Sequence, residues 1–362
     1  MEFETCSKRK IGLKGILYSC IKFVVKTALY AGHKKISIVG LEHIPTDKPV
    51  LFLPNHQSAL IDVLLIVTKC QRKPYFLTRA DVFSGSLLNR IFRFFRMLPI
   101  YRLRDGRQTL ANNKFVFDQC ADLFAEKEAL VLFPEANHNL KRRVRPLSKG
   151  FTRIILRTLE RYPDLDLQIV PVGLNFKHAI HFPDEVAVYY GPPISVKSLY
   201  DATDLGKSTL RIKETVSKKL KQLTTHVPEQ IEYEVAIKYL DAEHVDYLKP
   251  VEVNKKLQRY KEYNGVSVDD VSNKKEKLSS FRFFFVLLNL PVVLVWKLLI
   301  KPRVPEPEFI GTFRFAVVFV LFPLYCLGLA WIMSLLVGVK VALSLSAMVL
   351  LINVLLVKFV LR

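Results

Sequence analysis

An uncharged stretch near the C-terminus restricts this chain to the membrane proteins. Phe315–Val339 contains no charged residue, and a helix of that length crosses a bilayer core of about 30 Å. Val341–Val357 is also long and apolar enough to cross, and the side chain of Lys358 after it can reach back to the interface. A tight turn is expected at residues 338–340. We therefore expect a hairpin of two spans, at residues 315–337 and 341–361.

Basic residues at both outer ends of this hairpin predict its orientation. Arg314 precedes the first span, and Lys358 and Arg362 lie at the end of the second. Because Lys and Arg are enriched on cytoplasmic segments, both ends and the rest of the chain are expected on the cytoplasmic face. Segment 281–300 is also apolar, but it holds two basic residues and a central Asn-Leu-Pro, and a third span would export the basic loop that follows. We expect this segment to be interfacial or re-entrant.

Composition agrees with a cationic protein in a lipid environment. Half of the 362 residues are hydrophobic, mean hydropathy is +0.20, and the formal net charge is +21. That charge alone fits nucleic acid, anionic lipid or a phosphorylated substrate, and the apolar C-terminus favours lipid over nucleic acid. The five cysteines are scattered singly and form no CxxC pair. Neither a disulfide framework nor a zinc site is expected.

Residues 1–33 are predicted to form an N-terminal amphipathic, membrane-associated helix. Between residues 11 and 30, apolar side chains recur at helical spacing and lysines occupy other positions on the wheel. Two interpretations remain open. The helix packs on the core of the following domain, or it lies in the membrane interface with its lysines near anionic headgroups.

Residues 34–200 show the alternation of strands and helices that is typical of an α/β domain. Strands are expected at 34–40, 50–53, 75–78, 129–135, 167–176 and 186–194, and helices at 59–67, 89–97, 107–128 and 150–160. The polar, lysine-rich region 201–280 is expected to be a basic accessory layer. Its helices are predicted at 210–223 and 230–248, and a linker at 265–280. Residues 281–362 are the membrane region.

The first candidate site follows the strand at Val50–Leu53, which delivers Asn55, His56 and Asp62 into a small turn. Ser58 is expected to cap the next helix, so that the free amides of its first turn point back toward His56. A buried imidazole beside a carboxylate can act as a general base. Because positions six apart on a helix are turned by about 240°, His56 must precede the helix if Asp62 is to reach its ring.

The second candidate site is a pair of arginines after a short extended run. Arg102 and Arg104 carry guanidinium groups, whose paired donors match the geometry of phosphate. A surface turn with an ion pair between Arg104 and Asp105 is the alternative.

The third candidate site begins at Glu135, which ends an apolar strand and precedes His138. A basic cluster follows, consisting of Lys141, Arg142, Arg143, Arg145 and Lys149. These residues either bind an anionic substrate or form a solvated loop. Glu135 and His138 have the spacing of a helical metal-binding pair, but Pro134 and the preceding strand argue against a helix there. We expect no metal site.

Taken in order, these blocks resemble the motifs of the glycerolipid acyltransferase family, which includes glycerol-3-phosphate and 1-acylglycerol-3-phosphate acyltransferases. The resemblance covers about residues 35–195. Its four blocks are Asn55–Asp62, Ile100–Arg102, Phe133–Glu135 and Ile169–Val172. Two features differ from the usual family pattern. Five residues rather than four separate His56 from Asp62, as in a branch with fungal-type glycerol-3-phosphate acyltransferases, and His138 stands where the family commonly has an arginine.

The resemblance implies a mixed sheet covered by helices, and a role for each candidate residue. His56 would take the proton of an acceptor hydroxyl, and Asp62 would orient the imidazole. The residues expected to bind substrate are Asn55, Arg102, Arg104, Glu135, His138, Arg142, Arg143, Arg145 and Lys149. The donor would be acyl-CoA or acyl carrier protein, the acceptor a phosphorylated glycerol, and no cofactor is expected.

Two alternatives to glycerol-3-phosphate or 1-acylglycerol-3-phosphate acylation remain at this point. One keeps the chemistry but changes the acceptor to a lysophospholipid or another lysolipid. The other is of a different class, a non-catalytic, basic, membrane-anchored protein that holds anionic lipid. A lipid-binding scaffold has no need of His56, Asp62 and Glu135 at strand ends.

Overall fold

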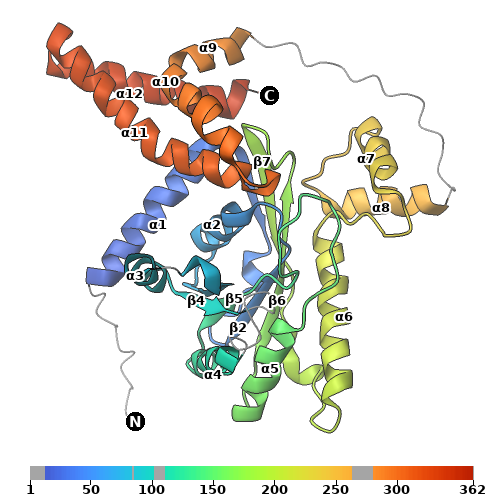
Figure 1. Cartoon of the computed structure of the whole chain (residues 1–362). Coiled ribbons are helices and arrows are strands. Elements are labelled where there is room, and N and C mark those ends of the chain that lie inside the picture. The colour runs from blue at the N-terminus through green and yellow to red at the C-terminus, as the bar shows by residue number, and fades with distance from the viewer. Residues whose placement is uncertain (1–12, 84, 102–110, 263–279, 362) are drawn as a thin grey trace, which may run out of the picture.

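An α/β domain, a helical layer beside it and a bundle of apolar helices make up the chain (Figure 1). The computed structural model describes residues 13–83, 85–101, 111–262 and 280–361.

The domain is built on one mixed sheet, as the family resemblance implies. Its strand order is β1-β7-β6-β2-β5-β3-β4, and β8 pairs with β6. Neighbouring strands are parallel except where β6 meets β7 and β8. The strands are β1 His33–Val39, β2 Val50–Pro54, β3 Tyr75–Arg79, β4 Met97–Ile100, β5 Ala129–Val131, β6 Gln168–Phe176, β7 Asp184–Tyr190 and β8 Ile194–Ser195.

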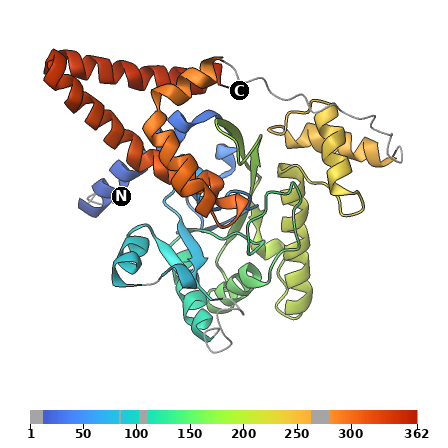
Figure 2. The same cartoon turned by 45° about the horizontal axis from the view of Figure 1, so that its top comes forward.

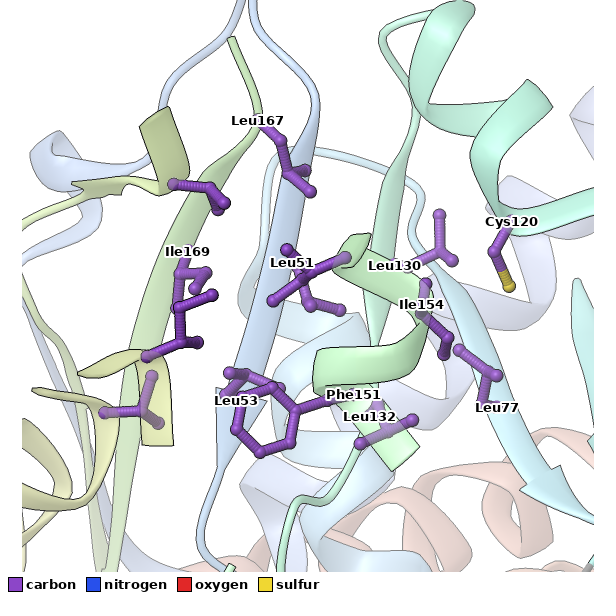
Figure 3. Packing of buried hydrophobic residues seen from close by; sticks show 14 of the residues in the cluster. Leu51, Leu53, Leu77, Cys120, Leu130, Leu132, Phe151, Ile154, Leu167 and Ile169 are labelled. Carbon is purple, nitrogen blue, oxygen red and sulfur yellow. The ribbon is translucent and has the colours of Figure 1, made fainter. Parts of the chain in front are cut away.

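The buried strands carry apolar side chains on both faces. On the central strand β2, Leu51 and Leu53 point to one face, where they pack against α4, α5 and α6. Figure 3 shows these two leucines beside Phe151 and Ile154 of α5. On the opposite face, the neighbouring residues of β2 contact the core formed with α1 and α2. A helix layer therefore covers each face, as parallel sheets require.

The helices of the α/β domain are α1 Leu13–Gly32, α2 Ala59–Lys69, α3 Ser86–Phe94, α4 Asn112–Ala125 and α5 Gly150–Arg161.

Two predicted strands are shorter in the structure. The predicted strand 186–194 is divided, because Gly191 and two prolines without amide donors separate β7 from β8. The predicted strand 129–135 is shorter: β5 ends at Val131, and the last amide that bonds to β2 is that of Leu132.

The N-terminal helix α1 has both a packed and an exposed apolar side. Leu29 is fully buried in the core beside α2, whereas Leu13 and Phe23 are 82% and 69% exposed. The predicted contact with the core is therefore present. Placement of the other side in the membrane interface remains a prediction.

The accessory region contains three helices, α6 Leu205–Leu223, α7 Tyr233–Ala242 and α8 Pro250–Glu262. The sequence reasoning predicted the first two and missed α8. Most side chains of α8 are polar, and the helix buries only a narrow stripe, Val253 and Leu257, against α7. That stripe is too short for the pattern to be recognised from sequence alone.

Two helices at the C-terminus, α11 Ile310–Val337 and α12 Val339–Leu355, are long and apolar enough to cross a membrane. They form the predicted hairpin, and the turn is shorter than expected, because Gly338 alone separates them at φ 82°. Before them, α9 Ser280–Leu288 and α10 Leu290–Leu294 belong to a segment bent by 95°. Residues 280–303 are therefore not one straight span.

Both outer ends of the hairpin are fixed to the α/β domain. Arg314 donates to the carbonyl of Ile180, 2.9 Å away, and Lys358 donates to that of His33, 2.7 Å away. Figures 1 and 2 show the hairpin projecting from the domain on the side away from α7 and α8.

Candidate active site

His56 and Asp62 are in contact at the carboxyl end of β2. The imidazole Nδ1 lies 2.7 Å from Asp62 Oδ2, and the Asp62 side chain is fully buried. His56 lies in the turn before α2, as the spacing requires, and Asp62 lies in the first turn of that helix. Because an ionised carboxylate only accepts hydrogen bonds, Nδ1 carries the proton and Nε2 keeps a free lone pair.

The start of α2 is capped by Asp62 rather than by Ser58. Ser58 occupies the N-cap position, as predicted, but its hydroxyl makes no capping bond. Instead, Asp62 Oδ2 also accepts from the amides of Gln57 and Ser58, at 2.8 Å each. Ala59 follows with a φ of 39°, a left-handed conformation that costs a non-glycine residue roughly 1–3 kcal/mol. The turn therefore holds the imidazole and carboxylate together at the expense of local strain.

Asn55 ties this turn to the sheet. Its side-chain amide donates to the carbonyl of Leu174 at 3.0 Å, and its oxygen accepts from the Leu174 amide at 2.7 Å. The side chain is nearly buried and bridges β2 to β6. The structure thus gives Asn55 a positioning role next to His56.

The loop between β5 and α5 encloses the imidazole. Phe133 stacks on the His56 ring with centroids 3.9 Å apart, and His138 meets the same ring edge-on at 5.6 Å. The amide of Asn139 donates to the His56 carbonyl at 3.0 Å. The predicted first and third sites therefore come together.

Glu135 is buried beside the pair and is held by an arginine of the same loop. Arg145 Nε donates to Glu135 Oε2 at 2.8 Å, and only 4% of the glutamate side chain is exposed. Burial raises the pKa of Glu135 to about 7, although the Arg145 guanidinium opposes the shift. The group therefore changes charge near neutral pH.

The segment that enters α11 covers the same site. His138 Nε2 donates to Glu306 Oε2 at 2.8 Å, and the amide of Leu60 donates to Thr312 Oγ1 at 3.1 Å. Phe309 packs edge-on against the His138 ring, with centroids 4.7 Å apart. This contact between residues 306–312 and the histidine site was not predicted, because nothing in the sequence links the two segments.

Three potential metal ligands meet at this contact. The ligand atoms of His138, Glu306 and Glu308 all lie within 4.8 Å of one another. Glu135, whose spacing to His138 resembles a helical metal-binding pair, is not among these ligands. The bond from His138 to Glu306 already engages two of the three groups.

A small polar pocket lies beside the imidazole. Its walls are formed by Asn55, His56, Gln57, Glu135, Asn139, Lys141, Arg143, Val144, Thr224 and Thr225. The two threonines come from the end of α6, which approaches β6 closely at Gly173, where any Cβ would lie 2.2 Å from the Leu223 carbonyl oxygen. The hydroxyl of Thr225 is buried and has no hydrogen-bond partner among the described residues.

The predicted basic residues are divided by the structure. Arg143 lines the pocket and also donates to the carbonyls of Val227 and Pro228. Arg145 binds Glu135, and Lys149 is an exposed residue at the start of α5. Arg102 and Arg104 lie outside the described residues.

Arg142 is the clearest departure from the prediction. Its guanidinium donates to the carbonyls of Phe176 and Lys177 at 2.8 Å and stacks on Tyr247 at 3.6 Å. It does not line the pocket beside His56. Its guanidinium thus fastens the loop to β6 and to the accessory region.

Sequence reasoning missed several pocket residues. Lys141 belongs to the basic cluster but is not among the residues expected to bind substrate, and Thr224 and Thr225 lie far from the motifs, in the predicted accessory layer. The cluster itself was the only signal for Lys141. No local pattern marked the threonines, because the packing of α6 on β6 brings them to the site.

This arrangement can remove a proton from a hydroxyl group and hold an anion beside it. The free Nε2 of His56 is the acceptor, Lys141 and Arg143 supply positive charge, and Glu135 supplies a carboxylate. The chemistry agrees with a comparison of sequences, in which the family model described as Acyltransferase matches residues 35–175. Residues 35–175 are an Acyltransferase-family domain. The domain contains the first and third sites, and also the second, whose two arginines lie outside the described residues.

Similar proteins include acyltransferases of two kinds. Glycerol-3-phosphate O-acyltransferase 1 of Saccharomyces cerevisiae is 26% identical over 114 residues, which cover 30% of this chain and 15% of the yeast protein. A 1-acyl-sn-glycerol-3-phosphate acyltransferase of Chlamydomonas reinhardtii is 28% identical over 141 residues, 39% of this chain and 38% of the algal protein. Human mitochondrial glycerol-3-phosphate acyltransferase 1 is 26% identical over 143 residues, 37% of this chain and 17% of the human one. The similarity thus spans well under half of each relative.

Among solved structures, the 1-acyl-sn-glycerophosphate acyltransferase PlsC of Thermotoga maritima is similar at a TM-score of 0.43 and 17% identity. The similarity covers 60% of this chain and 84% of that one.

Proposed function

We propose that this chain is a membrane-bound acyltransferase. It transfers a fatty acyl group from an acyl thioester, acyl-CoA or acyl carrier protein, to a hydroxyl of glycerol-3-phosphate or 1-acylglycerol-3-phosphate. The observation that carries the proposal is the contact of His56 with Asp62 beside a cationic pocket, within a domain of the acyltransferase family.

In the proposed reaction, His56 Nε2 removes the proton from the acceptor hydroxyl. The oxygen attacks the thioester carbonyl carbon, and the tetrahedral intermediate expels the thiolate, which takes the proton from the imidazolium. Asp62 holds the proton-bearing Nδ1 and stabilises the imidazolium as its charge develops. Direct transfer needs no acyl-enzyme, which agrees with the position of the Ser58 hydroxyl against Gly311.

The acceptor's phosphate would bind beside the base at the entrance of this pocket, which itself has room for little more than one water molecule. Lys141 and Arg143 line this pocket, and the unpartnered hydroxyl of Thr225 supplies a neutral donor. Glu135 would accept hydrogen bonds from the glycerol hydroxyls. In this assignment, Arg143 takes the role of the arginine that the family commonly has at the position of His138.

Few amides at the start of α2 remain free to stabilise the oxyanion of the tetrahedral intermediate. The amides of Gln57 and Ser58 are bound by Asp62, and that of Leu60 is bound by Thr312. Among the described residues, the amide of Ala59 has no hydrogen-bond partner, so we assign it as the oxyanion donor. A donor of this kind contributes about 3–4 kcal/mol in other acyl-transfer sites.

The proposed location is a membrane, with the domain on the cytoplasmic face. Two helices are apolar enough to cross, and the basic residues at both outer ends of the hairpin support a cytoplasmic placement. Because residues 306–312 contact the site itself, a lysolipid acceptor would reach His56 without leaving the bilayer surface.

The test is acyl transfer by the full chain purified in detergent. The enzyme receives radiolabelled acyl-CoA and, separately, glycerol-3-phosphate, 1-acylglycerol-3-phosphate and a panel of lysophospholipids. We expect labelled product with one of the first two acceptors and none with His56→Ala. Product with a lysophospholipid alone would transfer the assignment to that acceptor. Lipid binding with no product from any acceptor and either thioester donor would favour a non-catalytic lipid-binding protein.

A further inference from the structure

A groove of about 1140 Å³ lies between α6 and α8, apart from the pocket beside His56. Four lysines line it: Lys213, Lys218 and Lys221 on α6, and Lys255 on α8. Glu214 is the one acidic side chain in its walls. Among the described residues, no carboxylate forms an ion pair with any of the four lysines. The groove therefore carries an uncompensated positive charge that suits a polyanion.

The walls of the same groove are apolar. Leu210 of α6 and Val251 of α8 both line it and are 60% and 56% exposed. Exposed apolar side chains within a cationic groove favour a ligand that combines phosphates with a flat ring. A nucleotide has this combination, because its base is covered by apolar contacts while its phosphates meet the lysines.

The groove adjoins the catalytic pocket through one shared wall. Leu147 and His226 line the groove, and Val144 and Thr225 line the pocket. The two walls are joined where the Val144 amide donates to His226 Nδ1 at 3.1 Å. The groove and the pocket therefore lie on the two sides of one wall.

We propose that this groove binds the nucleotide end of the acyl-CoA donor, with its lysines on the phosphates and Leu210 and Val251 against the adenine. The pantetheine arm then passes the wall at Val144 and His226, and the thioester reaches His56. This inference rests on the proposed acyl transfer and commits it to CoA as the donor. The groove residues other than Pro146 and Leu147 lie beyond the family match, which ends at residue 175.

Two other occupants fit the surface less well. In both views, α6 and α8 lie on the side of the sheet away from the hairpin of α11 and α12, so the lysines do not share the hairpin's side of the domain with lipid headgroups (Figures 1 and 2). A carrier protein is a second macromolecule, and a stable protein–protein interface covers about 800 Å² on each partner, which is more than this groove provides.

The experiment measures steady-state transfer by the full chain in a neutral detergent, with acyl-CoA varied at saturating acceptor. The test variant is K213E/K218E. We expect the KM for acyl-CoA to rise about ten-fold or more, equivalent to one lost charged hydrogen bond. The acceptor KM and kcat should stay within about two-fold. K219E provides a matched control because Lys219 is on the same helix and does not line the groove.

A second donor identifies the group that is bound. With acyl-dephospho-CoA, which lacks the 3′-phosphate, the wild-type KM should already be high and the double variant should add little. An unchanged KM for acyl-CoA in K213E/K218E would overturn the groove assignment. The proposed function is tested separately, by whether the wild type transfers the acyl group. An equal rise with K219E would mean a general charge effect and would also overturn the groove assignment. If the wild type uses acylated acyl carrier protein and not acyl-CoA, the proposed nucleotide site is wrong and the proposed acyltransferase function is kept.

Discussion

His138 and Glu306, which are 168 positions apart in the chain, lie with Nε2 and Oε2 only 2.8 Å apart. The first belongs to the loop after β5, and the second to the connection into the membrane helix α11. The histidine ring also meets the ring of His56. The membrane anchor is thus part of the wall around the proposed base, and its position sets the shape of the site.

Removal of the proposed base should abolish transfer. We expect His56→Ala to lower kcat by about 10²- to 10⁴-fold, the usual contribution of a positioned general base. The control His181→Ala changes a histidine outside the site and should keep near wild-type activity. The measurement is radiolabelled acyl transfer by detergent-purified protein, and equal activity of His56→Ala and wild type would refute the assignment.

Asp62→Asn should lose activity and stability together. Asp62 Oδ2 accepts from the His56 ring and from two backbone amides. An amide group cannot receive all three bonds in the same way, and an unsatisfied buried donor costs roughly 1–3 kcal/mol. We therefore expect a lower melting temperature than that of His56→Ala and a strongly reduced kcat. A stable, inactive Asp62→Asn would restrict the residue to orientation of the imidazole.

Two glycines of α11 allow the contact with the site to be tested within one helix. A Cβ at Gly311 would lie 3.0 Å from Ser58 Oγ, whereas a Cβ at Gly328 would meet nothing within 4 Å. Gly311→Val should push α11 away from α2 and lower kcat about ten-fold or more, because small misplacements at a site are costly. Gly328→Val should leave kcat unchanged. Similar activities of both variants would show that the anchor does not shape the site.

The pKa of Glu135 predicts a pH dependence with a definite sign. Burial raises this pKa to about 7, above that of an unfolded glutamate near 4.3. The native state therefore binds the proton more tightly, so its contribution to stability is present below about pH 4 and is lost as pH rises to about 7. We expect the melting temperature of Glu135→Gln, relative to wild type, to increase between pH 5 and pH 8. A constant difference across this range would contradict the raised pKa.

Two asparagines stabilise the bent segment against the hairpin. Asn289 Nδ2 donates to Asn353 Oδ1 at 2.6 Å, and the Tyr325 hydroxyl donates to the carbonyl of Leu288 at 2.8 Å. Irregular backbone among apolar helices requires such partners. Asn353→Leu should destabilise the protein by about 0.5–2 kcal/mol, and changing Asn289 to Leu as well should recover part of the loss. Additive losses in the double variant would show that the pair does not interact.

The hairpin also predicts the accessibility of tags in sealed vesicles. A tag after residue 362 should be cut by protease from the same side as the α/β domain, because Arg314 and Lys358 fix both outer ends to that domain. A tag inserted at Gly338 should be cut only from the opposite side. Cleavage of both tags from one side would refute the two-span hairpin.

Local pattern predicted the elements that carry the motifs. The apolar run before His56 forms β2, and the spacing to Asp62 correctly required the imidazole to precede α2. The hydrogen bonds of the side chains were harder to predict from the sequence. Ser58 has the residue type and position of a cap, but Asp62 Oδ2 takes the amides of Gln57 and Ser58. A sequence pattern does not show which of two nearby oxygens is better placed.

Long-range packing decided the rest of the site. Arg142 looked like a substrate ligand because it follows a strand end, yet Tyr247 and the carbonyl of Phe176 bury its charge. Thr225 has no motif around it and reaches the pocket because the end of α6 docks on β6. The position of Glu306 beside His138 likewise depends on where α11 begins. These positions follow from the assembly of the elements, which local sequence does not encode.

The single-residue turn at Gly338 limits what the far side of the membrane can contribute. With no loop between α11 and α12, this connection exposes no surface there for a receptor, a protease or a bound ion. Through the hairpin, a property of the bilayer itself, such as its thickness or lateral pressure, can act on the site. Because α11 begins against His138 and Ser58, a change in the tilt of this helix would move the residues that surround His56.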